Sequence, residues 1–182
     1  MAYQLSNPIQ IVEHDPNWPV LFEQEKQRIL SLLGNVIIDL QHFGSTSVPG
    51  LAAKPILDLL GAVRTLDDIP SCTQPLRTLG YEDASVYLGQ WILEDRRLFC
   101  KGPYNEGTHH LHLVQSGSET WVKNLRFRDY LRAHPESAAE YIQLKAQLAN
   151  SHQTDIDGYT DGKTAFIRAV MNGASAPVTT SK

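Results

Sequence analysis

Two apolar segments on either side of a turn-rich connection constrain the fold of this chain more than any other feature. Val36 to Phe43 is rich in β-branched and aliphatic residues, and Pro55 to Val63 is apolar apart from Asp58. Runs of this length and composition are typical of buried β-strands. Gly44 follows the first run, and Ser45 to Lys54 carries several hydroxyl groups and a Pro-Gly pair. The sequence therefore predicts two strands joined through a glycine turn.

The other segments predict helices packed on a small mixed sheet. We expect one helix ending at Leu33, a second over Leu66 to Leu79, and a helical C-terminal third starting near Glu119. Further strands are predicted at Ile9–Glu13, Val86–Leu93, Arg97–Cys100 and His109–Gln115. This order of elements favours an α/β (α+β) fold. We expect the strands Val36–Phe43, Pro55–Val63 and His109–Gln115 to be neighbours.

Length and composition predict one domain. The chain has 182 residues, of which 42% are hydrophobic and 20% charged, and these values are close to the globular average. No composition change or linker divides residues 1–173, which we assign to a single domain. Residues 174–182 are small and polar, and we expect them to form a flexible tail.

Charge and cysteine content narrow the classes of partner and location. The formal net charge is -4, which counts against a duplex-DNA binder, because such proteins carry an excess of Lys and Arg. No apolar run is long enough to span a membrane, and the N-terminus lacks the pattern of a secretory signal. Cys72 and Cys100 are isolated, so we expect two free thiols in a reducing compartment. These features predict a cytoplasmic protein.

The turn after the first strand has the residues of an anion-binding site. Gly44 has no side chain, so it allows a ligand to approach the backbone closely. Backbone amides after Gly44, with the hydroxyls of Ser45, Thr46 and Ser47, are predicted to bind phosphate oxygens, and Lys54 would add a mobile cation. The alternative interpretation is a capped turn without a ligand.

Asp58 is the acidic residue inside the second apolar strand. A carboxylate there is costly unless it pairs with a cation or binds a metal. Asp58 is therefore interpreted either as a metal ligand or as the partner of a structural arginine.

A pair of histidines could complete this metal site. His110 and His112 are two residues apart, so they share one face of the predicted strand. With Asp58 they would supply two imidazoles and a carboxylate to a transition metal, or His112 would act as a general base beside a phosphate. The alternative is that both histidines satisfy hydrogen bonds on a polar strand face.

Other basic residues are candidates for binding phosphate. Arg97 and Lys101 share one strand face, whereas Arg96 points to the other face and is the weaker candidate. Lys163 begins the last predicted helix and could reach the same site. The alternatives are an exposed sheet edge for the strand residues and a surface position for Lys163.

The segment from His42 to Asp58 resembles the glycine-serine motif of the nucleotidyltransferase superfamily. More narrowly, it is similar to the signature of the GrpB-like family (UPF0157). Further motifs resemble that family in the same order along residues 8–171: Arg96–Lys101, His109–Leu113, Phe127–Leu131 and Tyr159–Lys163.

This resemblance implies a nucleotidyltransferase-like fold and transfer of a nucleoside monophosphate from a nucleoside triphosphate to an unidentified acceptor. Ser45 would bind phosphate, and Asp58 would bind a divalent metal, Mg²⁺ or Mn²⁺, with a transition metal possible through His110 and His112. The superfamily pattern places a second carboxylate two residues after the first, where this chain has Leu60. The resemblance therefore also allows a binding module that holds nucleotide without turnover.

Overall fold

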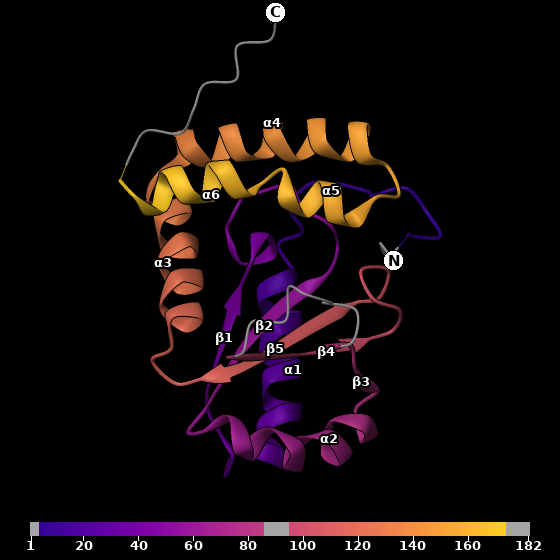
Figure 1. Ribbon diagram of the computed structural model, residues 1–182, viewed down its shortest axis with the longest axis vertical. Helices are drawn as coiled ribbons and strands as arrows, with labels where there is room; N and C mark the ends of the chain where they lie inside the picture. Colours follow the sequence, from indigo (N-terminus) through magenta and orange to yellow (C-terminus); the bar gives the residue numbers. More distant parts are fainter. Residues whose placement is uncertain (1–3, 86–94, 174–182) are drawn as a thin grey trace, which may run out of the picture.

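Five strands of the described residues form one mixed sheet with helices on both faces (Figure 1). The computed structural model describes residues 4–85 and 95–173. The strands of the described residues are β1 Ile37–Phe43, β2 Leu57–Val63, β3 Tyr81–Asp83, β4 Arg96–Lys101 and β5 His109–Gln115. They lie in the order β1-β2-β5-β4-β3. The predicted mixed α/β fold is confirmed, and so is the adjacency of the three strands named above.

Helices account for the rest of the regular structure. They are α1 Trp18–Leu33, α2 Ile69–Thr78, α3 Glu119–Ala133, α4 Pro135–His152, α5 Ile156–Asp161 and α6 Thr164–Met171, with short 3₁₀ turns η1 Ser45–Ser47 and η2 Leu66–Asp68. Local sequence explains several of their ends. The Ser118 hydroxyl caps α3 by accepting a hydrogen bond from the Trp121 amide, and Pro135 occupies the first turn of α4, where its missing N–H is not needed.

Strand register decides which side chains share a face of the sheet. β2 and β5 are parallel, with Asp58 opposite His110 and Leu60 opposite His112. β4 runs antiparallel to β5 and places Cys100 opposite His110. Because directly paired residues point to the same side, all of these side chains lie on one face of the sheet.

The two faces of the sheet pack differently. α1 and α2 cover one face and bury the main apolar core, which includes Phe22, Leu59, Leu111 and Phe99. On the opposite face, α3 packs Trp121 and Leu125 against a smaller cluster of Phe43, Leu60 and Val114. α4, α5 and α6 form a separate layer at one end of the sheet (Figure 1). That layer closes over the face that carries Asp58.

Several predicted boundaries differ from the structure. Ile9–Glu13 is not a strand, because its backbone hydrogen bonds go to two different segments of the chain. Val12 pairs with Ala53, whereas the Ile9 amide donates to the Gln153 carbonyl. The predicted helix over Leu66–Leu79 begins with η2 and becomes α-helical at Ile69. The predicted strand Val86–Leu93 and the expected tail 174–182 lie outside the described residues.

The states of the two cysteines and the character of the helices bear on the predicted location. Cys72 in α2 and Cys100 in β4 are both buried and free, as expected. Within residues 4–85 and 95–173, no helix combines the length and apolar character needed to cross a membrane.

Candidate functional site

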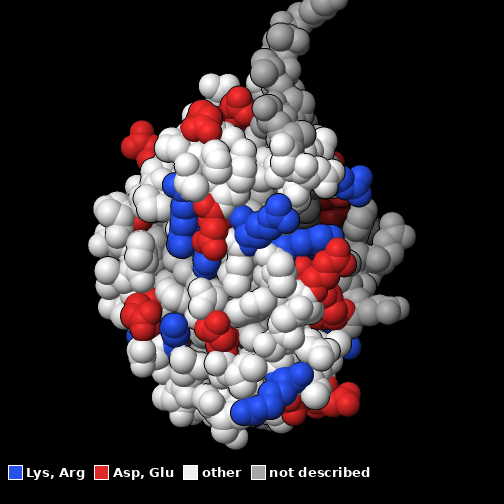
Figure 2. Space-filling model, turned by 90° about the vertical axis from the view of Figure 1, so that its left-hand side faces the viewer, with Lys and Arg blue, Asp and Glu red and all other residues white. Residues whose placement is uncertain are grey.

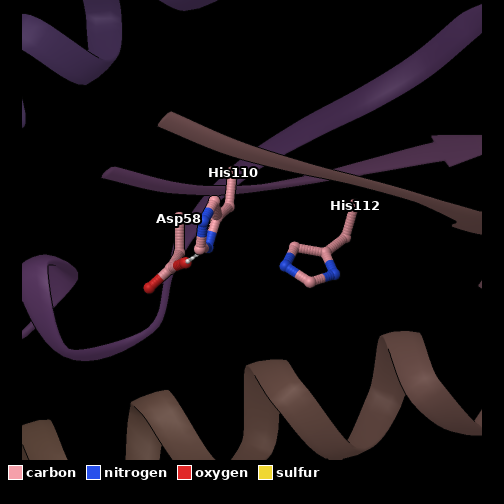
Figure 3. A group of neighbouring side chains, drawn as sticks. All are labelled: Asp58, His110 and His112. Carbon is pink, nitrogen blue, oxygen red and sulfur yellow. Dashed lines mark ion pairs between the residues drawn. The ribbon is translucent and has the colours of Figure 1, made fainter. Parts of the chain in front are cut away.

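Asp58, His110 and His112 converge on the sheet face below the C-terminal helices. Asp58 comes from β2 and both histidines from the adjacent strand β5 (Figure 3). The Asp58 Oδ1 and His110 Nδ1 atoms are 3.5 Å apart, and the two imidazole centroids are 6.4 Å apart. One potential ligand atom from each residue lies within 4.8 Å of the others. Such a group has the spacing needed to hold one metal ion.

Gly44 makes room for the Asp58 carboxylate. Its backbone has φ 67° and ψ -174°, a conformation that is essentially restricted to glycine. A Cβ atom at this position would lie 2.2 Å from Asp58 Oδ2 and 2.8 Å from Asp58 Cγ. Any side chain at position 44 would therefore displace the carboxylate. The glycine serves the site through this space and through its backbone conformation.

Both imidazoles have a ring nitrogen suited to binding a metal. His110 Nε2 and His112 Nδ1 are buried without a hydrogen-bond partner among the described residues. Burial, and then the charges of Arg96 and His110, hold the pKa of His112 well below its usual range. His112 is therefore neutral at physiological pH. Two imidazoles and one carboxylate fit a transition metal such as Zn²⁺ or Mn²⁺ better than they fit Mg²⁺, which is seldom bound by imidazole.

Three lysines line the same pocket as the metal-ligand group. The pocket has a volume of about 390 Å³, and its lining includes Asp58 and both histidines together with Lys54, Lys145 and Lys163. Lys54 and Lys163 place their ammonium groups over the Tyr159 ring, 5.5 and 4.4 Å from its centroid. Lys54 also donates a 2.5 Å hydrogen bond to Asn105, and Lys145 donates to the Ala52 carbonyl. None of the three forms an ion pair with a carboxylate in the described part of the chain.

The lysines are crowded and incompletely neutralised. Burial and the charge of Lys163 lower the pKa of Lys54 to about 7, against an opposing effect of Asp58. The same causes lower the pKa of Lys145 to about 7. Burial lowers the pKa of Lys163 to about 8, again opposed by Asp58. An anion in the pocket would favour the charged form of all three lysines. The pocket thus combines a metal-ligand group with three lysines that form no ion pair among the described residues, although Asp157 and Asp161 also line it.

The hydroxyl residues of η1 have separate roles. Ser45 and Thr46 line the pocket, and the Thr46 hydroxyl also contacts His42 Nε2 at 3.0 Å. The Ser47 hydroxyl donates to the Gly44 carbonyl at 2.6 Å, and the Ser47 amide bonds to the same oxygen. Ser47 therefore closes the turn, which leaves Ser45 and Thr46 as the hydroxyl residues that face the pocket.

Arg97 and Lys101 are not brought to this pocket. Their strand positions place them on the α1 side of the sheet, and the Lys101 ammonium donates to Glu25 Oε1 at 2.6 Å. Arg96 instead lies on the face that carries the histidines and lines the pocket. The sequence correctly predicted that Arg96 and Arg97 point to opposite faces of the sheet. Arg96, predicted to be the weaker candidate, is however the one that points to the site.

Comparison with known proteins identifies the family. The family described as GrpB protein matches residues 8–173. This chain belongs to the GrpB family. A crystal structure described as conserved protein GrpB from Enterococcus faecalis is 37% identical, with a TM-score of 0.79 over 90% of this chain and 96% of that one. The fold of the family is therefore shared over almost the whole length of both chains.

Curated relatives within the family differ in length. UPF0157 protein YqkA of Bacillus subtilis is 38% identical over 91% of this chain, which spans 47% of that relative. Glutamate-rich protein GrpB of Alkalihalophilus pseudofirmus is 34% identical over 89% of this chain and 93% of the relative. A dephospho-CoA kinase of Mycolicibacterium paratuberculosis is 26% identical over 88% of this chain but only 44% of its own length. The activity named for that longer protein is not thereby assigned to this chain.

Lys145 and Tyr159 are among the pocket residues for which the sequence predicted no role. Lys145 is only 2% exposed and lies on the buried stripe of α4, between Tyr141 and Ala149. A lysine on such a stripe is a usable signal, because an unpaired buried ammonium requires a reason. Tyr159, which supports two of the lysines, belongs to a motif of the family resemblance but was given no role.

Two arginines of α3 bind the backbone at both ends of the Gly44–Ser47 turn. Arg128 Nη1 donates to the His42 carbonyl at 3.0 Å, and Arg132 Nη2 donates to the Ser47 carbonyl at 2.8 Å. Asp129 bridges the two guanidinium groups, at 2.7 Å from Arg128 Nε and 3.6 Å from Arg132 Nη1. The two ends of the turn are thus fixed to the same helix, and Arg128 and Asp129 belong to the Phe127–Leu131 motif.

We expect Arg128→Met to loosen this turn. The change removes charge-assisted bonds to the His42 carbonyl and Gln41, so unfolding free energy should fall by about 1.5–3 kcal/mol. Amide hydrogen exchange at Ser47 should accelerate beyond this global effect. Arg126→Met, on an exposed position of the same helix, should change stability by less than about 0.5 kcal/mol. Equal exchange rates at Ser47 in parent and Arg128→Met would contradict the clamp.

Proposed function

We propose that this GrpB family chain is a metal-dependent nucleotidyltransferase that moves a nucleoside monophosphate from a nucleoside triphosphate to an acceptor. The observation that carries the proposal is the composition of one pocket. Asp58, His110 and His112 form a metal-ligand group, and three lysines without carboxylate partners among the described residues line the same cavity. In a metal-bound triphosphate, the cation would be held by the metal-ligand group and the phosphate oxygens by the lysines.

Each residue of the pocket has a defined task in this proposal. A divalent metal, when bound, would neutralise charge that develops on the transferred phosphoryl group. Lys54, Lys145 and Lys163 bind the terminal phosphates and stabilise the departing pyrophosphate, with Ser45 beside them. His112 serves as a metal ligand in preference to a general base, because one of its ring nitrogens lies within 4.8 Å of the ligand atoms of Asp58 and His110.

The second candidate is a module that binds metal-nucleotide without turnover. Leu60 favours it, because this residue is fully buried beneath Trp121 and Leu125 of α3 where the superfamily would have a second carboxylate. His112 lies directly opposite Leu60 on β5 and supplies a ligand from the neighbouring strand instead. The site therefore has one carboxylate and two imidazoles, a set suited to a single metal ion.

We propose a small nucleotide in the cytoplasm as the ligand, and not duplex DNA. Acidic and basic side chains are interspersed on the face that carries α3 (Figure 2), and the net charge of the chain is -4. A duplex binder needs a continuous excess of basic groups. The two buried free thiols support a reducing compartment.

The decisive test is Asp58→Asn, which keeps the side-chain volume but removes the charge. In the parent, Mn²⁺ with ATP should raise the unfolding free energy by about 2.7 kcal/mol at a hundredfold excess over Kd. The variant should lose this gain. Without ligand, its stability should change by much less than the about 3–5 kcal/mol expected for a broken buried ion pair, because no Lys or Arg lies within 4.0 Å of Asp58 among the described residues.

A pair of histidine variants controls for nonspecific effects. His112→Asn should also abolish the Mn²⁺-dependent gain, whereas His109→Asn, on the same strand but the opposite face, should retain it. Denaturant unfolding with and without Mn²⁺ and ATP measures all of these values. Release of pyrophosphate, with label from the nucleotide appearing on an acceptor, would separate the enzyme from the binding module. If Mn²⁺ with ATP does not stabilise the parent chain, both the enzyme and the binding module are refuted.

A further inference from the structure

We propose that Arg96 binds an anionic group of the acceptor, so that the acceptor is a compound carrying a carboxylate or a phosphate. This inference rests on the proposed function and specifies its acceptor. It assigns the lysines to the triphosphate and Arg96 to the second substrate, on the other side of the metal-ligand group.

The register of the sheet separates the two basic regions. On β5, His110 lies opposite Asp58, and His112 is one step further along the same face. Arg96 is paired with Val114, one step beyond His112. The lysines lie at the other end, before the start of β2. Lys145 donates to the Ala52 carbonyl, and Lys54 and Lys163 share the Tyr159 ring. The metal-ligand group therefore stands between Arg96 and the lysines.

Arg96 has the features of a ligand-binding arginine. Its side chain lines the pocket, and its buried Nε atom has no hydrogen-bond partner within the described ranges of the chain. No carboxylate of those ranges forms an ion pair with it, although Asp95 is adjacent in sequence. The side chain as a whole is partly buried, but a buried guanidinium N–H without a partner is costly unless a ligand accepts a hydrogen bond from it. Its planar donor set matches carboxylate and phosphate oxygens in pairs.

The arrangement fits in-line transfer. An acceptor oxygen would form a bond to the α-phosphorus while the bond from that phosphorus to the bridging oxygen of pyrophosphate breaks. Pyrophosphate would leave toward Lys54, Lys145 and Lys163, and the proton of the acceptor hydroxyl would pass to solvent water. In-line displacement requires entering and leaving oxygens on opposite sides of the phosphorus. An anion held by Arg96 places the acceptor on the side away from the lysines.

The test uses two probes in sequence. The full chain is first saturated with Mn²⁺ and tripolyphosphate, which should occupy the lysine side, and is then titrated calorimetrically with sulfate or with acetate at constant ionic strength. We expect one further anion to bind. Sulfate binding would indicate a phosphate-bearing acceptor, and acetate binding a carboxylate-bearing one. Arg96→Met should weaken this second event by at least about tenfold and leave tripolyphosphate affinity within about threefold, since it removes charge-assisted bonds to one ligand only.

Matched variants separate this inference from the proposed function. Arg97→Met, on the opposite face, should change neither affinity, and Lys163→Met should weaken tripolyphosphate alone. Arg96→Met should stay folded, because Arg96 forms no ion pair with a carboxylate of the described residues. Arg96→Lys, which lacks the planar fork, provides a second variant with the charge retained. If tripolyphosphate binds but neither second anion does, or if Arg96→Met loses tripolyphosphate, the acceptor assignment is overturned. Failure of tripolyphosphate to bind the parent would instead overturn the lysine role.

Discussion

Gly44→Ala is expected to abolish Mn²⁺ binding and to destabilise the folded chain. The added Cβ atom would lie 2.2 Å from Asp58 Oδ2, so the carboxylate must leave the position in which it faces His110. The backbone conformation adds a cost of about 1–3 kcal/mol, because alanine rarely adopts it. Denaturant unfolding should therefore show a lower midpoint, and Mn²⁺ should no longer raise it.

Two further variants separate the backbone effect from the collision with Asp58. Gly50 also has a positive φ, 75°, but a Cβ atom there would meet nothing within 4 Å. Gly50→Ala should lose stability and keep its response to Mn²⁺. In the Gly44→Ala background, Asp58→Ala should recover part of the lost stability, because it removes the colliding group. A Gly44→Ala chain that binds Mn²⁺ as tightly as the parent would show that the carboxylate does not need this space.

The sequence was sufficient to predict the centre of the fold and of the candidate site. An apolar β-branched run identified β1, and an apolar run interrupted by Asp58 identified β2. The two-residue alternation of a strand placed His110 and His112 on one face of β5. The adjacency of β2 and β5 was expected as part of the small mixed sheet, and the structure confirms it. These features depend on local patterns and on a small number of strand orders, which is why they could be predicted.

Sequence could not decide which face of β4 points to the site. Alternation showed that Arg96 lies on one side and Arg97 with Lys101 on the other, but the pairing of β4 with β5 sets which side carries the histidines. Lys145 posed a similar problem, because α4 follows the sheet in sequence and reaches the pocket only through packing of the C-terminal layer. Both depend on contacts between distant segments.

Lys101→Met is expected to have the largest effect on stability of any lysine variant outside the pocket. Lys101 Nζ lies 2.6 Å from Glu25 Oε1, and the Glu25 side chain is 3% exposed. Removing the lysine leaves a buried carboxylate with only Arg28, at 3.6 Å, as an ion-pair partner among the described residues. We expect a loss of about 3 kcal/mol, the lower end of the range for a broken buried pair. Tripolyphosphate affinity should remain unchanged, in contrast to Lys163→Met.

The pH dependence of Lys101→Met gives a check that a packing defect would not reproduce. Burial raises the pKa of Glu25, but in the parent the hydrogen bond and charge of Lys101 outweigh burial and hold that pKa below its usual value of 4.5. The ionised Glu25 therefore stabilises the parent above pH 4.5, and this contribution is lost as pH falls through the folded pKa. Without Lys101, the effect of burial on the Glu25 pKa dominates and raises it, so protonation of Glu25 stabilises the variant. The stability deficit should shrink between pH 7 and about pH 4 in denaturant unfolding. A deficit independent of pH, or loss of tripolyphosphate binding, would contradict a role confined to the α1 side of the sheet.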